Sequence, residues 1–185
     1  MLGKNILNKL TSLVLTVTIL SVYSMVALAG TKGVNGEITV TGSVTVNGQT
    51  VVSNSTIVSG STIVTGANSS ATISLGKVGR IEVLPNSNFV LNFADSSITG
   101  IIEEGKVRVS NGAGIATTIT SKHSVAIADA GQANTFIVEA ECSHTHIDTV
   151  SGAVTMRTGN TDKQVAAGTD ATAGNLTQTG CKPCF

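Results

Sequence analysis

The stretch EITVTGSVTVNGQTVV, residues 37–52, decides the fold class. Apolar residues alternate with small polar ones, as at Ile38 and Val40. Because the side chains of a β-strand point to opposite faces in turn, this period of two predicts strands with one buried face. Asn47-Gly48 interrupts the pattern and predicts a hairpin, since both central residues of a tight turn need positive φ.

The alternation continues along the rest of the chain in short runs such as NFVLNF, TFIVEA and GAVTMR, separated by glycine or asparagine. No window has the apolar stripe of a helix. We therefore predict a single all-β domain over residues 30–172, with solenoid-like or jelly-roll-like coiling of short strands. The tandem copies QTVVSN, STIVSG and STIVTG (residues 49–66) favour solenoid-like coiling, although a Ser/Thr/Val-rich composition alone also produces such copies. The predicted aromatic core consists of Phe89, Phe93 and Phe136.

The first 29 residues have the composition of a signal peptide. Lys4 and Lys9 precede an apolar run that ends in Ala-Leu-Ala, the small-x-small pattern that signal peptidase recognises. We expect cleavage between Ala29 and Gly30 and a periplasmic or extracellular protein. The alternative is a retained leader, which would be the chain's contact with a membrane.

Charge and aromatic content limit the classes of partner. Without Lys4 and Lys9 the chain keeps 9 basic residues against 11 acidic ones, so it lacks the basic surface that nucleic acid requires. It contains no tryptophan, and its one tyrosine, Tyr23, lies in the leader. The aromatic surfaces on which bases or sugars stack are therefore almost absent.

The order of the strand motifs resembles the FecR-like family of extracytoplasmic bacterial domains. The matching pieces begin at GRIEVLPNSNFVLNF, continue with GIIEEGKVRVS and TITSKHSVAIADAGQANTFIVE, and end with TVSGAVTMRTGN and KQVAAGTDATAG. This resemblance covers roughly 120 residues, most of the chain after the leader. It implies an all-β, extracytoplasmic, non-catalytic domain.

The best-known members of this family regulate sigma factors through a cytoplasmic segment, while their periplasmic part senses a receptor. Here nine residues precede the apolar run that starts at Leu10, and we expect no sigma-binding segment from them. No counterpart of the family's C-terminal receptor-linked domain is expected either. The resemblance thus implies the fold and the extracytoplasmic setting rather than the sigma-regulator role.

The segment ECSHTH places Cys142, His144 and His146 at alternate positions, where they would line one side of a strand. Thiolate and imidazole are ligands that zinc prefers. Positions two apart on a strand lie about 6.5–7 Å apart, however, so three ligands would splay without a bulge. We expect no metal and no cofactor, and we interpret the segment as strand surface with Ile147 pointing to the core.

Three cysteines, Cys142, Cys181 and Cys184, follow the leader. In an exported protein cysteines form disulfides, and the favoured interpretation is a bridge from Cys142 to one of the two tail cysteines. The tail, residues 173–185, is predicted to be flexible. Cys181 and Cys184 have the spacing of a redox dithiol but lack the following helix that lowers a thiol pKa.

No pattern predicts catalysis. Glu103 and Glu104 are adjacent, so on a strand they would face opposite ways and could not flank one glycosidic bond. Nothing matches the Gly-x-Ser-x-Gly pattern of serine hydrolases. We predict a non-catalytic binding or scaffold module with a protein or cell-envelope partner.

Two alternatives to this function remain open. One is a structural subunit that self-assembles as a homo-oligomer or filament through strand edges, because the stretch from Glu37 to Gly76 carries a single charge. The other is a metal or thiol-redox protein that would use Cys142, His144 and His146 together with the tail dithiol of Cys181 and Cys184.

Overall fold

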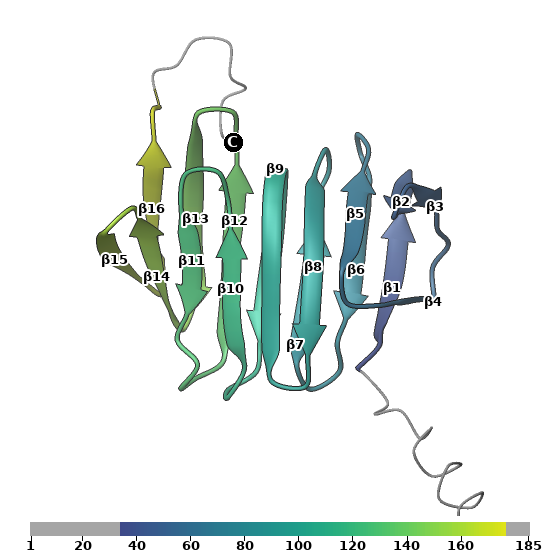
Figure 1. The fold of residues 1–185 in the computed structure, drawn as a ribbon, viewed down its shortest axis with the longest axis horizontal. Helices are drawn as coiled ribbons and strands as arrows, with labels where there is room; N and C mark the ends of the chain where they lie inside the picture. The colour runs from purple at the N-terminus through teal and green to yellow at the C-terminus, as the bar shows by residue number, and fades with distance from the viewer. Residues whose placement is uncertain (1–33, 177–185) are drawn as a thin grey trace, which may run out of the picture. The chain divides into compact units, whose positions relative to one another are not determined.

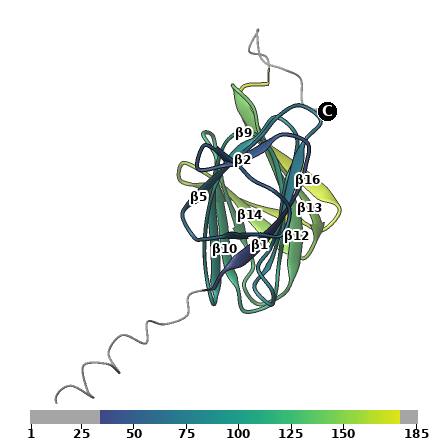
Figure 2. The same ribbon diagram turned by 90° about the vertical axis from the view of Figure 1, so that its right-hand side faces the viewer.

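The computed structural model describes residues 34–176, and all of its regular elements are β-strands. Its strands form two layers that face each other, as Figure 2 shows edge-on. The predicted all-β class is confirmed. In this part of the chain no helix has the length and hydropathy needed to cross a membrane. The predicted leader, residues 1–29, and the cleavage position at Ala29 and Gly30 lie outside the described residues.

Layer A contains eight strands in the spatial order β4-β1-β6-β7-β9-β12-β13-β16. Their bounds are β1 (Gly36–Thr41), β4 (Ser55–Ile57), β6 (Ser70–Ser74), β7 (Gly79–Val83), β12 (Asn134–Ala140), β13 (His144–Ser151) and β16 (Thr169–Gly174), joined by the second half of β9 (Ser97–Asn111). Every pairing within layer A is antiparallel.

Layer B has the order β3-β2-β5-β8-β9-β10-β11-β14-β15. It contains β2 (Val44–Val46), β3 (Gln49–Thr50), β5 (Ser61–Thr65), β8 (Asn88–Ala94), β10 (Ala116–Thr120), β11 (Val125–Ala128), β14 (Ala153–Thr158), β15 (Thr161–Ala166) and the first half of β9. The pairing of β9 with β10 is parallel.

Strand β9 belongs to both layers, and it lies at the centre of Figure 1. Residues 97–104 pair with β8 in layer B, and residues 105–111 pair with β7 and β12 in layer A. The pairing with β8 shifts register between Asn88 and Phe89, a bulge at the point where the strand changes layers. Gly105, with φ of +96°, lies at the same point.

The six-residue copies at 49–66 do not stack as coils of a solenoid. They contribute β3, β4 and β5, of which β4 pairs with β1 in layer A while β5 pairs with β2 and β8 in layer B. Successive copies therefore go to opposite layers and make antiparallel pairs. The solenoid-like expectation is wrong, because each copy is too short to form a complete coil and pairs instead with distant strands.

The core fills the space between the two layers. Phe89 and Phe136 are fully buried and Phe93 is nearly so, which confirms the predicted aromatic core. The remaining core consists mostly of isoleucine, valine and alanine at the inward positions of the strands. Asn47 and Gly48 both have positive φ and join β2 to β3, as the hairpin prediction required.

Strand β16 extends past the predicted domain boundary at residue 172. It ends at Gly174, and Ala171 and Ala173 are buried against the core. The alternation in this stretch is carried by alanine, which is small enough to be missed in a sequence pattern. Residues 177–185, which include Cys181 and Cys184, lie outside the described residues.

Candidate functional site

Cys142 does not share a strand face with the two histidines. It lies exposed in the loop between β12 and β13, while His144 is the first residue of β13. The three side chains therefore do not line one strand face, and that part of the prediction is wrong. The chain turns between Ala140 and His144, where the amide of Glu141 donates to the His144 carbonyl, so Cys142 stands at the tip of the turn.

His144 and His146 do share one face of β13. Their ring centroids lie 5.0 Å apart in an edge-to-face arrangement. His144 is buried, and its Nδ1 lies 3.1 Å from the Ser143 hydroxyl. His146 is half-buried, and its Nδ1 lies 2.7 Å from the hydroxyl of Thr172 on β16. Ile147, the next residue along the strand, is fully buried, as predicted.

Among the side chains that the structure describes, these histidines have no partners for a metal centre. Over residues 34–176 no group of three His, Cys, Asp or Glu side chains is arranged to hold a metal ion. The ring of His146 is instead oriented by its hydrogen bond to Thr172. The strand face at His144 and His146 is therefore packed and hydrogen-bonded.

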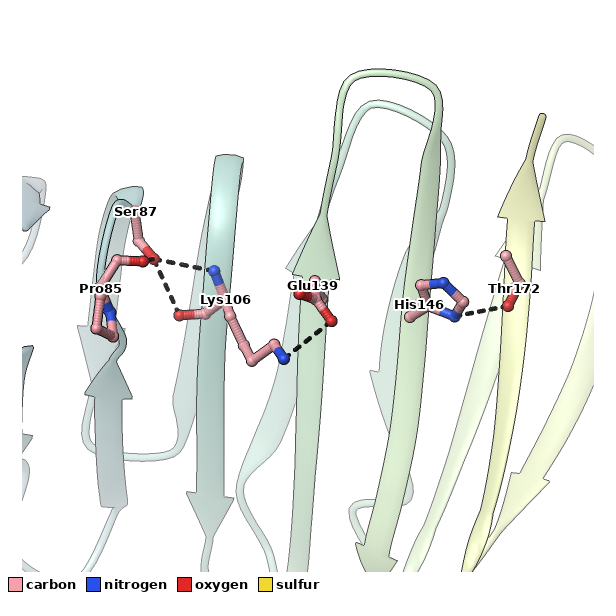
Figure 3. Close-up of polar contacts among 6 residues, drawn as sticks. All are labelled: Pro85, Ser87, Lys106, Glu139, His146 and Thr172. Atoms are coloured by element: carbon pink, nitrogen blue, oxygen red, sulfur yellow. Dashed lines mark hydrogen bonds and ion pairs between the residues drawn. The ribbon is translucent and has the colours of Figure 1, made fainter. Parts of the chain in front are cut away.

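The outer face of layer A carries a row of polar contacts across four strands, shown in Figure 3. Lys106 on β9 is in register with Glu139 on β12, and their Nζ and Oε2 atoms lie 3.0 Å apart. Glu139 is in turn in register with His146, and His146 with Thr172. Two residues further along β9, Arg108 forms a second ion pair with Glu82 on β7. Its Nη1 atom lies 3.3 Å from Oε2 of Glu82.

The row was not predicted. Lys106 and Glu139 are separated by more than thirty residues, and each is an ordinary polar position on a half-exposed strand. Only the register of β9 against β12 brings them together. The alternation of the sequence indicates that these residues face outward, but it carries no signal for which strand is the neighbour.

Glu103 and Glu104 lie where β9 changes layers. Both are exposed, because the bulge opposite Asn88 turns Glu104 away from the core position that alternation would give it. Glu103 accepts a hydrogen bond of 2.7 Å from the side-chain amide of Asn88. This pair is a polar surface feature at the bulge.

A third ion pair joins two neighbouring strands of layer B. Nε and Nη2 of Arg157 on β14 donate to the two carboxylate oxygens of Asp162 on β15, at 2.7 and 2.8 Å. This two-pronged hydrogen bond lowers the pKa of the Asp162 carboxyl and raises that of the guanidinium. Both groups are exposed, so the pair anchors an edge strand without being part of an enclosed site.

The two ends of the sandwich differ in polarity. The end formed by β15 presents Asp162 and Lys163, charges of the kind that protect a strand edge. The end formed by β3 and β4 is short and uncharged, and two valines stand out from it: Val52 is 72% exposed and Val58 is 54% exposed.

No protein-family model matches this chain, and no curated protein matches its sequence. The fold is similar to two crystal structures of a putative anti-sigma factor from Parabacteroides distasonis ATCC 8503, at 2.50 and 1.65 Å resolution. Each is 11% identical over 63% of this chain, with a TM-score of 0.54. The chain covers 55% and 56% of the length of those two chains.

Because the sequence identity is only 11%, this likeness shows a shared fold and nothing further. It agrees with the all-β fold of the described residues.

Proposed function

We propose that this chain is an exported, FecR-like, non-catalytic β-domain that binds or scaffolds a protein or cell-envelope partner in the periplasm or at the cell surface. The observation that carries the proposal is the fold shared with the putative anti-sigma factor of Parabacteroides distasonis. A factor of that kind is named for its action on another protein. The ion-paired outer face of layer A adds support, because it offers a rigid polar surface for contact.

Export is part of this proposal. Residues 1–29 act as the leader, and cleavage between Ala29 and Gly30 releases the domain. An extracytoplasmic location also suits the cysteines, since disulfides persist there.

We further propose that Cys142 is bridged to Cys181 or Cys184. Cys142 is exposed at the tip of the loop between β12 and β13, where a tail cysteine can reach it. The last described residues also run toward it: His144 is in register with Gly174, and the Asn175 amide donates to the Ser143 carbonyl at 2.8 Å. The chain therefore leaves layer A beside the loop that carries Cys142, and a bridge would tie the tail to that loop.

Expression of the full chain with its leader, followed by cell fractionation and intact mass measurement, tests export and the bridge together. The expected species is extracytoplasmic, starts at Gly30, and gains two hydrogens on reduction. In the variant Cys142→Ser, reduction should no longer raise the mass by two hydrogens. A cytoplasmic chain that still carries Met1 would refute export, and an unchanged mass on reduction would refute the bridge.

Partner binding is tested by placing a photo-cross-linking residue on the outer face of layer A at Ile137 and, as a matched control, on the outer face of layer B at Ile101. One dominant adduct from one face only is expected. Equal weak adducts from both faces would contradict a specific partner, and so would a saturable hydrolytic activity that co-purifies with the domain.

The second candidate function is self-assembly through strand edges, and the uncharged end at β3 and β4 favours it. Exposed valines beside an unprotected edge invite pairing with another chain. Light scattering over a wide concentration range should then show growth that Val52→Lys abolishes, while Lys163→Gln at the opposite end leaves it unchanged. A monomer at every concentration would exclude this candidate.

A further inference from the structure

An open groove of about 420 Å³ lies on layer A, where strand β7 begins and strand β9 ends. The turn between β6 and β7, the end of β9 and the start of β12 meet there. Arg80 on β7 is in register with Ser110 on β9, and Ser110 with Thr135 on β12. The hydroxyls of Ser110 and Thr135 lie 3.1 Å apart and form one wall of the groove.

Two glycines bring the backbone strands at this end close together. A Cβ at Gly79 would collide with the carbonyl oxygen of Ser110, and a Cβ at Gly112 would lie 2.9 Å from that of Lys77. Both positions line the groove. The wall there is peptide backbone, which a ligand can approach without meeting a side chain.

The groove is positively charged. Lys77 and Arg80 line it, both are exposed, and none of the groove's lining residues is acidic. Within residues 34–176, Lys106, Arg108 and Arg157 form ion pairs with carboxylates, whereas neither groove cation does. Glu82, the next outward residue on β7, is engaged by Arg108. The charge of Lys77 and Arg80 is therefore available to an outside anion.

A buried hydrogen-bond acceptor lies in the same wall. Asn111 is 4% exposed and lines the groove. Its side-chain amide donates to the carbonyl of Gly112 at 3.0 Å, but its Oδ1 has no partner within the described residues. A buried polar atom left in this way costs free energy until a donor reaches it, either directly or through a water molecule.

We propose that this groove docks an acidic peptide segment of a protein partner. Carboxylates of the segment would pair with Lys77 and Arg80, and its backbone amides would supply donors to the hydroxyls and to Asn111. No aromatic side chain lines the groove, so a nucleobase or a sugar ring would find no stacking surface. The groove spans β7, β9 and β12, which at a strand spacing of about 4.8 Å accommodates roughly four extended residues.

The docking proposal rests on the proposed protein-binding function, but the groove can be tested alone. A fluorescent peptide of alternating glutamate and glycine is titrated against the purified full chain at low salt, with the glutamine version as a neutral control. We expect saturable binding of the acidic peptide and at least about tenfold weaker binding of the neutral one. Because exposed charges are screened, binding should also weaken steeply as salt is added.

The double variant Lys77→Gln/Arg80→Gln should weaken peptide binding about tenfold, whereas Lys163→Gln, which removes an exposed cation from β15, should leave it unchanged. Since Lys77 and Arg80 are exposed, the double variant should keep the melting temperature of the parent. Equal loss with Lys163→Gln would overturn the proposal, since net charge alone would then explain binding. Tighter binding of glucuronate or inorganic phosphate than of the peptide would also overturn it.

Failure of the groove is separable from failure of the proposed function. If the cross-linked partner adduct persists in Lys77→Gln/Arg80→Gln, the partner docks elsewhere and only the groove assignment is wrong. If the parent gives no adduct while the acidic peptide still binds in the groove, the groove stands and the scaffold function loses its support.

Discussion

The Ser87 side chain is hydrogen-bonded to both backbone groups of Lys106. The Lys106 amide donates to Ser87 Oγ at 2.9 Å, and the hydroxyl lies 3.2 Å from the Lys106 carbonyl, to which it donates (Figure 3). Ser87 belongs to the turn between β7 and β8, and Lys106 lies just past the point where β9 changes layers. One buried hydroxyl thus fixes the position of the strand that links the two layers.

Ser87→Ala should destabilise the domain by about 1–3 kcal/mol, because the part-buried amide of Lys106 would lose its acceptor. Urea unfolding followed by circular dichroism measures the change. Ser96→Ala, at an exposed position in the turn between β8 and β9, is the matched control and should have little effect. Equal unfolding midpoints for the two variants would show that the Ser87 hydroxyl does not stabilise β9 at the point where it changes layers.

Gly105→Ala should destabilise the domain more than a positive φ alone can explain. Gly105 has φ of +96°, and an added Cβ would lie 2.6 Å from the Asn86 carbonyl oxygen. Gly114 also has positive φ, +81°, but an added Cβ there meets no atom within 4 Å. Gly114→Ala should therefore cost only the conformational penalty of about 1–2 kcal/mol. A smaller loss of stability for Gly105→Ala than for Gly114→Ala would contradict the close approach of Gly105 to the Asn86 carbonyl.

Phe89→Ala should destabilise the domain by roughly 3–5 kcal/mol, since it leaves a cavity in a packed core. The ring is fully buried and lies against Gly100, where an added Cβ would collide with it. Thermal unfolding with Val52→Ala, at an exposed position, as the control gives the comparison. A loss below about 1 kcal/mol would mean that the core collapses around the site.

The carboxyl of Asp162 should titrate below its usual pKa, because it accepts two hydrogen bonds from Arg157. A carboxyl whose pKa is lowered by folding contributes stability above its unfolded pKa of about 4, and that contribution is lost as the pH falls through the folded value. Carbon-detected NMR titration of the carboxyl measures this pKa. In Arg157→Gln it should return toward the ordinary value, and an unchanged titration would show that the pair does not persist in solution.

Local sequence patterns were sufficient for the class of fold and for some turns. Alternation over residues 37–52 predicted strands with one buried face, and Asn47-Gly48 predicted the hairpin between β2 and β3. These features depend on neighbours along the chain, so a sequence displays them directly. The expected solenoid was wrong because repetition in sequence does not state which strands pair.

In the candidate sites, too, local sequence patterns predicted only part of the arrangement, and strand pairing decided the rest. The segment from Cys142 to His146 suggested one continuous strand, but the chain turns at Cys142, and only the pairing of β13 with β12 and β16 places that turn. The groove combines Arg80, Ser110 and Thr135, which come from three separate strands. No spacing in the sequence marks them as neighbours.

By itself the sequence determined an all-β domain, its aromatic core and the outward position of residues such as Lys106 and Glu139, because the two-residue period of a strand is a local property. Only the tertiary structure decided the division into two layers, the ion pair of Lys106 with Glu139 and the charged groove at Lys77 and Arg80. Those depend on the register between strands far apart in the chain, which is set by how all the buried faces pack together.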